Sequence, residues 1–293
     1  MNNVVKKISK KVMPALGTVS PTLVTRVLFR KYLGMPLNLK NPRTLNEKMQ
    51  WLKLNVYNHD PKVTQCVDKY RVREYIKDCG REDLLVKLYG VWDSADEIDF
   101  DKLPTEFVLK CNHGSGSIII CRDKTQLNID DIKRKLNAWM KEDFGIQRAE
   151  MVYKNVQRKI ICEELINTQD GKAPKDYKFF CSYGIPKFLF VASDRNGEHA
   201  YFDYFSLDWE HYDVINEHPH SPVPLGKPDQ FQEMIKAAGD IAGDFPIVRV
   251  DLYNENGKVY FGELTFLHFG GLHPFIPAEF DTFFGDMLPL NIR

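Results

Sequence analysis

The stretch RVDLYNENGKVYFGELTF, residues 249–266, decides the fold. Its apolar and polar side chains alternate on both sides of Asn256-Gly257, a dipeptide typical of a tight turn between antiparallel strands. The resulting β-hairpin places Asp251 and Glu263 almost opposite each other, provided that the strands pair in register. Two facing carboxylates repel each other unless a cation lies between them, and Mg²⁺ suits such a pair. The stretch therefore predicts an antiparallel hairpin whose two acids are candidate magnesium ligands.

Two further polar residues lie beside these acids. Arg249 precedes Asp251 by two positions and Thr265 follows Glu263 by two, so all four side chains project from one strand face. A guanidinium there could neutralise charge that develops on a phosphoryl or acyl group. For the two acids alone, a hairpin with outward-facing carboxylates is the simpler interpretation. Four polar groups on one face of otherwise apolar strands favour a functional site.

The stretch FVLKCNHGSGS, residues 107–117, is an apolar strand that ends in a loop of small residues. Glycine lets such a loop turn its backbone N–H groups toward an anion. The pattern is neither GxxxxGK[ST] nor GxGxxG, so it predicts neither a Walker loop nor a Rossmann fingerprint. A plain Gly/Ser hairpin turn is the alternative. The candidate phosphate-binding residues are Lys110, His113, Ser115, Gly116 and Ser117.

A third candidate lies in IICEELINTQDGKAPKDYKFF, residues 160–180. The tetrapeptide Glu163-Glu164-Leu165-Ile166 ends an apolar strand, where free backbone groups could pair with the edge of a flat heterocycle. Asp170 could accept hydrogen bonds from ribose hydroxyls, and Lys178 offers a second ammonium. An exposed acidic strand end and a surface lysine remain the alternative interpretation of each residue.

Composition bounds the class of protein. The 293 residues include 40 basic and 40 acidic side chains, and this balance predicts no nucleic-acid partner. The hydrophobic content of 43% is that of an ordinary globular chain, long enough for two domains. No apolar run reaches the ~20 residues of a membrane span, and we expect no signal peptide. Six cysteines without CxxC spacing predict reduced, mostly buried thiols in the cytoplasm.

Basic residues gather in the first part of the chain, where nine of them precede the first acid, Glu47. They are Lys6, Lys7, Lys10, Lys11, Arg26, Arg30, Lys31, Lys40 and Arg43. A solvated helix face or a mobile arm accounts for this pattern. The alternative is peripheral contact with an anionic membrane leaflet or a lipid-linked anionic glycan, which would place the protein at the inner face of the cytoplasmic membrane.

The periodicity of the chain predicts an α+β fold in three parts. Helices are expected at 22–33, 44–55, 68–80, 131–145 and 229–243, and strands at 84–92, 107–112, 159–166, 176–195 and 248–266. Thr44 and Glu47 form a capping-box pattern. The parts are an N-terminal helical, basic region (1–60), an α+β module with the Gly/Ser loop (61–160) and a C-terminal module with the metal-binding hairpin (161–293).

Taken in order, these motifs resemble the ATP-grasp superfamily, and most closely its TupA-like group, which is named for teichuronopeptide biosynthesis and occurs in cell-surface polysaccharide loci. The resemblance spans Leu45 to Gly271. Its motifs are LNEKMQWLKL, DKYRVREYI, VLKCNHGSGS, DYKFF and RVDLYNENGKVYFGELTF. It implies an ATP-grasp fold, in which two α+β modules clasp ATP and a helical region precedes them.

The resemblance also implies roles for single residues. Lys110 and Lys178 would be the phosphate-side and adenine-side lysines, with Lys69 as a third. Ser115 to Ser117 would cover the β- and γ-phosphates, Glu163 to Ile166 would contact adenine, and Asp170 would bind the ribose. Asp251 and Glu263 would hold Mg²⁺, and Arg249 would steady the acylphosphate or the transition state. Thr265 stands where many ATP-grasp enzymes have asparagine. This difference leaves open whether the site would hold one metal ion or two.

The function implied is an ATP- and Mg²⁺-dependent carboxylate–amine ligase that forms an acylphosphate and acts in cell-surface polysaccharide biosynthesis. Its carboxylate could be a sugar uronate or an amino acid chain. A phosphotransferase or glycosyltransferase acting on a polysaccharide precursor is the alternative, and a nucleotide-sensing module is the non-enzymatic one. His268 and His273 flank FGG, residues 269–271, after the hairpin and could either face the acceptor or serve in packing or capping.

Overall fold

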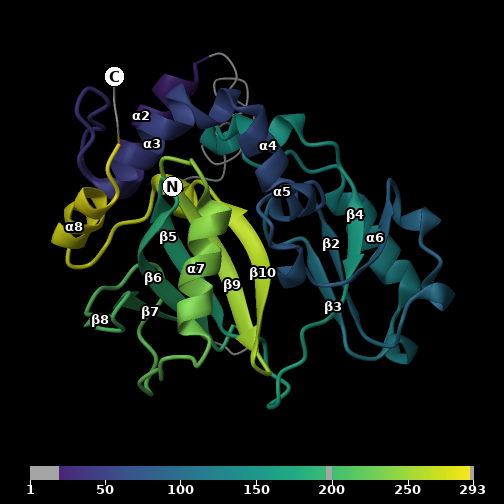
Figure 1. Cartoon of the computed structure of the whole chain (residues 1–293). Coiled ribbons are helices and arrows are strands. Elements are labelled where there is room, and N and C mark those ends of the chain that lie inside the picture. The colour runs from purple at the N-terminus through teal and green to yellow at the C-terminus, as the bar shows by residue number, and fades with distance from the viewer. Residues whose placement is uncertain (1–19, 196–199, 291–293) are drawn as a thin grey trace.

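Two antiparallel sheets, with helices packed around them, make up the computed structural model, which describes residues 20–195 and 200–290 (Figure 1). The α+β prediction is confirmed. Lys6, Lys7, Lys10 and Lys11 lie outside the described residues. In the part of the chain that is described, no helix combines the length and apolarity that crossing a membrane requires.

The smaller sheet has four strands in the order β1-β4-β2-β3, and the larger has six in the order β10-β9-β5-β6-β7-β8. The smaller contains β1 (Leu88–Trp92), β2 (Phe107–Cys111), β3 (Ile118–Cys121) and β4 (Ile160–Glu163). The larger contains β5 (Asp176–Ser182), β6 (Ile185–Ser193), β7 (Tyr201–Ser206), β8 (His211–Tyr212), β9 (Val248–Glu255) and β10 (Lys258–Thr265). The division predicted between residues 160 and 161 falls inside β4, which pairs with β1 and β2.

The helices are α2 (Pro21–Leu33), α3 (Leu45–Asn55), α4 (Pro61–Val67), α5 (Val72–Asp78), α6 (Ile129–Trp139), α7 (Phe231–Ala242) and α8 (Glu279–Met287). Short 3₁₀ turns are η1 (Tyr57–His59), η2 (Glu82–Leu84), η3 (Ala95–Glu97), η4 (Phe100–Lys102), η5 (Lys124–Gln126), η6 (Ile146–Arg148), η7 (Met151–Asn155) and η8 (His268–Gly271). The predicted N-terminal helices are thus present as α2 and α3.

Two predicted helix boundaries were wrong, and tertiary contacts explain both. The helix predicted to reach Gly145 ends at Trp139, because Arg158 Nη1 donates to the Met140 carbonyl at 2.8 Å and so satisfies an end of α6. The helix predicted from Asp68 begins at Val72. Asp68 accepts there from Asn112 Nδ2 at 2.8 Å, which ties the intervening turn to the smaller sheet.

The hairpin of β9 and β10 forms as predicted. Its turn residues Asn256 and Gly257 have φ of 53° and 73°, the left-handed values that a tight hairpin turn requires. In the resulting register Asp251 is the partner of Glu263, and Arg249 is the partner of Thr265.

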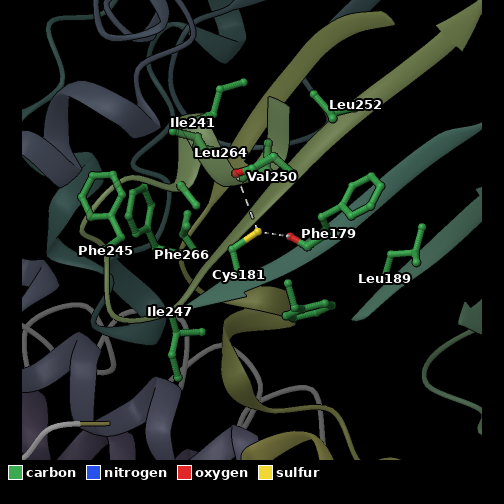
Figure 2. Packing of buried hydrophobic residues seen from close by; sticks show 14 of the residues in the cluster. Phe179, Cys181, Leu189, Ile241, Phe245, Ile247, Val250, Leu252, Leu264 and Phe266 are labelled. Carbon is green, nitrogen blue, oxygen red and sulfur yellow. Dashed lines mark hydrogen bonds between the residues drawn. The ribbon is translucent and has the colours of Figure 1, made fainter. Parts of the chain in front are cut away.

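The larger sheet separates an apolar face from a polar one, because side chains alternate along each strand. Figure 2 shows the apolar face, where Phe179, Cys181 and Val250 pack with Ile241 of α7. The Cys181 thiol lies 3.8 Å from the carbonyl oxygen of Ala238, also in α7. All six cysteines are free and all but one are buried, as predicted. Lys178, Arg249 and Asp251 alternate with these core residues and therefore project from the opposite face.

Helix α3 is anchored by the predicted capping box. Thr44 Oγ1 accepts from Glu47 N at 3.1 Å, and Glu47 Oε2 accepts from Thr44 N at 3.2 Å. From this helix Gln50 Nε2 donates to the Gly270 and Gly271 carbonyls, both at 2.7 Å, and so α3 fixes the segment that follows the hairpin.

We expect Thr44→Ala to lower the free energy of unfolding by about 1 kcal/mol, because the first turn of α3 loses its cap. Thr44→Ser keeps the hydroxyl and should stay within a few tenths of a kcal/mol of the native chain. Urea denaturation followed by circular dichroism measures both variants. Equal stability of the Ala and Ser variants would contradict a role for this cap.

Candidate functional site

A cavity of about 510 Å³ lies between the two sheets, within the usual range for small-molecule sites. Its lining comes from strands far apart in the sequence. The smaller sheet contributes Lys110 and Glu163, and the larger contributes Lys178, Arg249 and Glu263. The sequence singles out three separate segments, which therefore meet at one cavity: β2 with Lys110, the end of β4 with Glu163, and the hairpin of β9 and β10.

Lys110 and Glu163 reach the cavity because of strand alternation. Phe107, Leu109 and Cys111 of β2 pack into the core below the smaller sheet, so Lys110 points the other way. Its Nζ lies 2.9 Å from Oε2 of Glu163.

The Glu163 carboxylate is shared with a second cation, Arg73 of α5, whose Nη1 lies 3.0 Å from Oε1 of Glu163. The guanidinium also donates to the Val86 carbonyl at 2.7 Å. Glu163 thus holds a lysine and an arginine at the cavity wall, rather than presenting a free carboxylate.

The Gly/Ser loop covers one side of the cavity. Ser115, Gly116 and Ser117 are among its lining residues. Gly114 has φ of 78°, and a Cβ there would lie 2.7 Å from Cγ of Phe144, so no larger residue fits. The predicted small-residue loop is present where an anion could approach its backbone.

Lys69 is tied to this loop. Its Nζ donates to the Gly114 carbonyl and its backbone N donates to the Asn112 carbonyl at 3.0 Å. Burial lowers the pKa of Lys69, while Glu263 acts in the opposite direction. Asn112 also donates to Asp68 Oδ1 at 2.8 Å, so the asparagine connects the turn that carries Lys69 with the loop.

The Asp251 carboxylate lies fully buried between two cations. Arg249 donates to it through Nε and Nη2, each at 2.7 Å, and Lys178 Nζ also donates to Oδ2. Lys178 further pairs with Asp176 at 2.6 Å. Burial raises the pKa of Asp251, against the opposing effect of Arg249 and Lys178. This carboxylate is therefore engaged by protein groups on both oxygens.

Glu263 is the more accessible acid, with 42% of its side chain exposed. Burial within the site raises its pKa, but Lys69, Lys178 and Arg249 outweigh this and lower the pKa to about 2. Thr265 Oγ1 lies 3.4 Å from its Oε1 and accepts from Arg249 Nη2 at 2.9 Å. Glu263 is thus ionised at neutral pH. It lines the cavity, and the Thr265 hydroxyl lies beside its carboxylate.

This donor set fits Mg²⁺ and a triphosphate. Carboxylate and hydroxyl oxygens from Glu263, Asp251 and Thr265 are the ligands that a hard cation takes. The cavity also carries an excess of cations, as a triphosphate requires. Asp251 lies outside the lining of both cavities, and it could join such a metal only after Lys178 and Arg249 release one of its oxygens. The assignment of the three residues as metal ligands remains a prediction.

The other predicted site residues divide into two groups. Glu164, Leu165 and Ile166 line the cavity where β4 ends. Asp170 does not, because it is exposed in a turn where its Oδ1 accepts from Lys172 N at 3.0 Å. His113 is 4% exposed and also lies outside the lining, with no partner for its Nδ1.

His268 is buried outside the cavity lining and contacts the site through Arg249. Arg249 Nη1 donates to its Nδ1 at 2.6 Å, and its Nε2 lies 3.1 Å from Oδ1 of Asn216. Burial, together with Arg249, lowers its pKa well below the ordinary value, so the ring is neutral. His268 therefore orients Arg249. His273 pairs instead with Glu217.

A second cavity of about 210 Å³ adjoins the first. The lining residues that the two share include Lys69, Gly114, Ser115, Arg249 and Glu263. The second is also lined by Arg148 and Glu150, which the sequence analysis missed. Burial raises the pKa of Glu150 to about 7, against the opposing effect of Lys53 and Arg148.

Arg73, Asp176, Arg148 and Glu150 were all missed as site residues. Arg73 lies within DKYRVREYI and Asp176 opens DYKFF, so both stood inside motifs already noted. Arg148 ends the short 3₁₀ turn η6 and Glu150 immediately precedes η7, so neither has a periodic signal, and only their spacing around Ala149 could have drawn attention.

Comparisons with known proteins come from a family model and from solved structures. The model described as TupA-like ATPgrasp matches residues 47–289. No curated protein matches the chain in sequence. A D-alanine–D-alanine ligase from Bacillus anthracis complexed with ATP is similar, with 14% identity and a TM-score of 0.44 over 70% of this chain and 57% of that one.

Two more solved structures are similar to the chain. An L-amino acid ligase from Bacillus licheniformis has 14% identity and a TM-score of 0.47, over 84% of this chain and 55% of that one. The ATP-grasp ligase PsnB, complexed with a phosphomimetic variant of its minimal precursor, Mg and ADP, has 12% identity and a TM-score of 0.41, over 83% of this chain and 64% of that one. The chain spans little more than half the length of the two Bacillus ligases.

Proposed function

The chain belongs to the TupA-like ATP-grasp family, and on that premise we propose that it is an ATP- and Mg²⁺-dependent ligase that joins a carboxylate to an amine. One observation carries the proposal: Lys69, Lys110, Lys178 and Arg249 surround an accessible, ionised Glu263 in one cavity. Such a cavity suits a triphosphate whose charge a metal ion and basic side chains must neutralise.

In the proposed reaction the substrate carboxylate takes the γ-phosphoryl group of ATP, which releases ADP, and the amine then displaces phosphate from the acylphosphate. Bound ATP supplies the phosphoryl group and Mg²⁺ neutralises its charge. Lys110 and Lys69 hold the phosphate side and the loop excludes water. Arg249, oriented by His268, faces the charge that develops during transfer.

The proposal is tested by product analysis with purified full chain. Pools of uronates and amino acids are supplied as carboxylates and amines with MgATP. ADP, phosphate and an amide in equal amounts support the ligase. AMP and pyrophosphate as products would refute it. A phosphorylated product without amide would identify a phosphotransferase, and consumption of a sugar nucleotide without ATP would identify a glycosyltransferase.

The second cavity is the proposed site of the amine. It adjoins the first at Arg249 and Glu263, where the activated carboxylate would lie. Arg148 can bind an anionic group of the acceptor. Glu150 can take the proton that the amine loses when it attacks. The polysaccharide role is proposed from the biosynthetic group after which the family is named, with a uronate or an amino acid chain as the carboxylate.

The pH dependence of the rate follows from Glu150. Its carboxylate accepts a proton only when ionised, so kcat/KM should fall about tenfold per pH unit below the pKa of about 7 and level off above it. In Glu150→Gln this dependence should disappear and the rate above pH 7 should drop. Initial rates from pH 5.5 to 9 test this, with the exposed Glu142→Gln as control. An unchanged profile in Glu150→Gln would rule out the base.

We also propose that α2 contacts an anionic membrane surface or lipid-linked glycan on the cytoplasmic side. Its Arg26, Arg30 and Lys31 are exposed, and so are Leu23 and Val27, about half of each. Basic and apolar side chains together suit an anionic interface.

Co-sedimentation with vesicles of phosphatidylglycerol tests this contact. Reversal of Arg26, Arg30 and Lys31 to Glu should abolish binding, whereas reversal of the exposed Lys102, Lys236 and Lys258 should not. Equal vesicle binding by both triple variants would contradict a membrane contact through α2.

A further inference from the structure

We propose that Asp203, His211 and His220 form a zinc site at the edge of the larger sheet, apart from the cavity described above. Asp203 lies on β7 and His211 on β8, while His220 follows in the loop after β8. A ligand atom from each of the three lies within 4.8 Å of the other two. Two imidazoles and one carboxylate are a ligand set that Zn²⁺ takes, with water in the fourth position.

The distances between the donor atoms suit a tetrahedral ion. His211 Nε2 lies 3.2 Å from Asp203 Oδ1, and His220 Nδ1 lies 3.3 Å from the same oxygen. Zinc bonds of about 2.0–2.1 Å in a tetrahedron place neighbouring donors about 3.3 Å apart. Both imidazoles thus stand at this spacing from the carboxylate oxygen, and the two histidines' ligand atoms lie within 4.8 Å of each other.

The surroundings of the ligands support a metal rather than hydrogen bonds alone. His220 Nδ1 also lies 3.2 Å from the Phe202 carbonyl, and a proton there leaves the buried Nε2 without a hydrogen-bond partner. Zinc at Nδ1 would move the ring proton to Nε2. That atom lies 3.4 Å from Oδ1 of the exposed Asp213, whose carboxylate would then accept from the metal-bound imidazole.

The second oxygen of Asp203 is held from outside the cluster. Ser221 N donates to Oδ2 at 3.2 Å, which fixes the carboxylate with Oδ1 toward the two imidazoles. The carboxylate side chain is 7% exposed, whereas the imidazole side chains of His211 and His220 are 41% and 23% exposed. The site is therefore rigid at the acid and open to an entering ion at the histidines.

A metal bound here would stabilise β8, which pairs only weakly with the rest of the sheet. Strand β8 has two residues, and only Tyr212 and His211 pair with β7. The loop between His211 and His220 carries Asn216, which accepts from His268, the residue that orients Arg249. Zinc would thus bind this loop to the sheet. Through Asn216 it would also fix His268, which orients Arg249.

Calorimetric titration of the metal-stripped full chain with zinc chloride, in excess Mg²⁺, tests the site. One zinc ion per chain is expected, with a rise in the thermal midpoint. His211→Ala and His220→Ala should each weaken binding by more than about 100-fold, because loss of an outer partner alone costs 10–100-fold. His59→Ala, at an exposed histidine of η1, should bind as the native chain does.

Glu263→Gln separates this site from the ATP cavity, since its zinc binding should equal that of the native chain. The proposal is overturned if the native chain binds no zinc, or if His211→Ala and His220→Ala retain its affinity. Neither result depends on ligase activity, so failure here leaves the proposed reaction untouched.

Discussion

Glu263→Gln is expected to lower kcat for ATP-dependent amide formation by about 10²–10³-fold. The variant keeps the size and shape of the side chain, removes its charge and replaces one acceptor oxygen by an NH₂ donor. Glu263 is the accessible carboxylate of the cavity, and Lys69, Lys178 and Arg249 keep it ionised. Without that charge the site loses the group best placed to hold Mg²⁺. Steady-state rates over a range of Mg²⁺ concentrations measure the loss, which excess Mg²⁺ should reverse only in part.

Glu255→Gln is the matched control. It lies on the same hairpin, near the turn, and outside the lining of both cavities. Its rate should remain within twofold of the native rate. Native activity and native Mg²⁺ dependence in Glu263→Gln would show that the hairpin acid does not serve the reaction.

Arg249→Met is expected to lower the free energy of unfolding by about 3–5 kcal/mol. The guanidinium makes two hydrogen bonds to the Asp251 carboxylate, and both side chains are buried. Removal of the arginine leaves a buried carboxylate with Lys178 as its remaining cation and also leaves His268 Nδ1 without its donor. Urea denaturation followed by tryptophan fluorescence measures the loss.

The double variant Arg249→Met/Asp251→Asn tests the cause of that loss. Because Asn carries no charge, the double variant should be more stable than the sum of the two single effects predicts, by at least about 1 kcal/mol. Strict additivity would mean that the pair does not stabilise the fold as a unit. A loss below about 1 kcal/mol in Arg249→Met would contradict the buried network itself.

The sequence was informative wherever a local rule determined the geometry. The Asn256-Gly257 turn determines the register that sets Asp251 opposite Glu263, and alternation along the strand then places Arg249 on the same face. Both strands and the turn are continuous in the sequence, so no distant contact was needed to derive them.

The partners of these residues could not be derived in the same way. Lys178 meets Asp251 only because β5 pairs with β9, which lie some 70 residues apart. Arg73 reaches Glu163 from a helix that precedes β4 by more than 80 residues. Such contacts depend on the packing of whole elements, for which a single sequence contains no periodic signal.

The misplaced boundary of α6 has the same origin. Residues 140–145 continue the helical pattern of the sequence, yet Arg158 binds the Met140 carbonyl and Phe144 packs on Tyr153 with ring centroids 4.9 Å apart. The same local packing fills the space that a side chain on Gly114 would need. Tertiary contacts therefore overrode helix propensity beside the phosphate loop.

Calorimetric titration of the full chain with Mg²⁺ and a non-hydrolysable ATP analogue tests the central claim most directly. The account predicts one analogue bound per chain, with a Kd between about 1 μM and 1 mM, and at least tenfold weaker binding in Lys110→Ala. No binding heat from folded native protein, or equal affinity in Lys110→Ala, would contradict it.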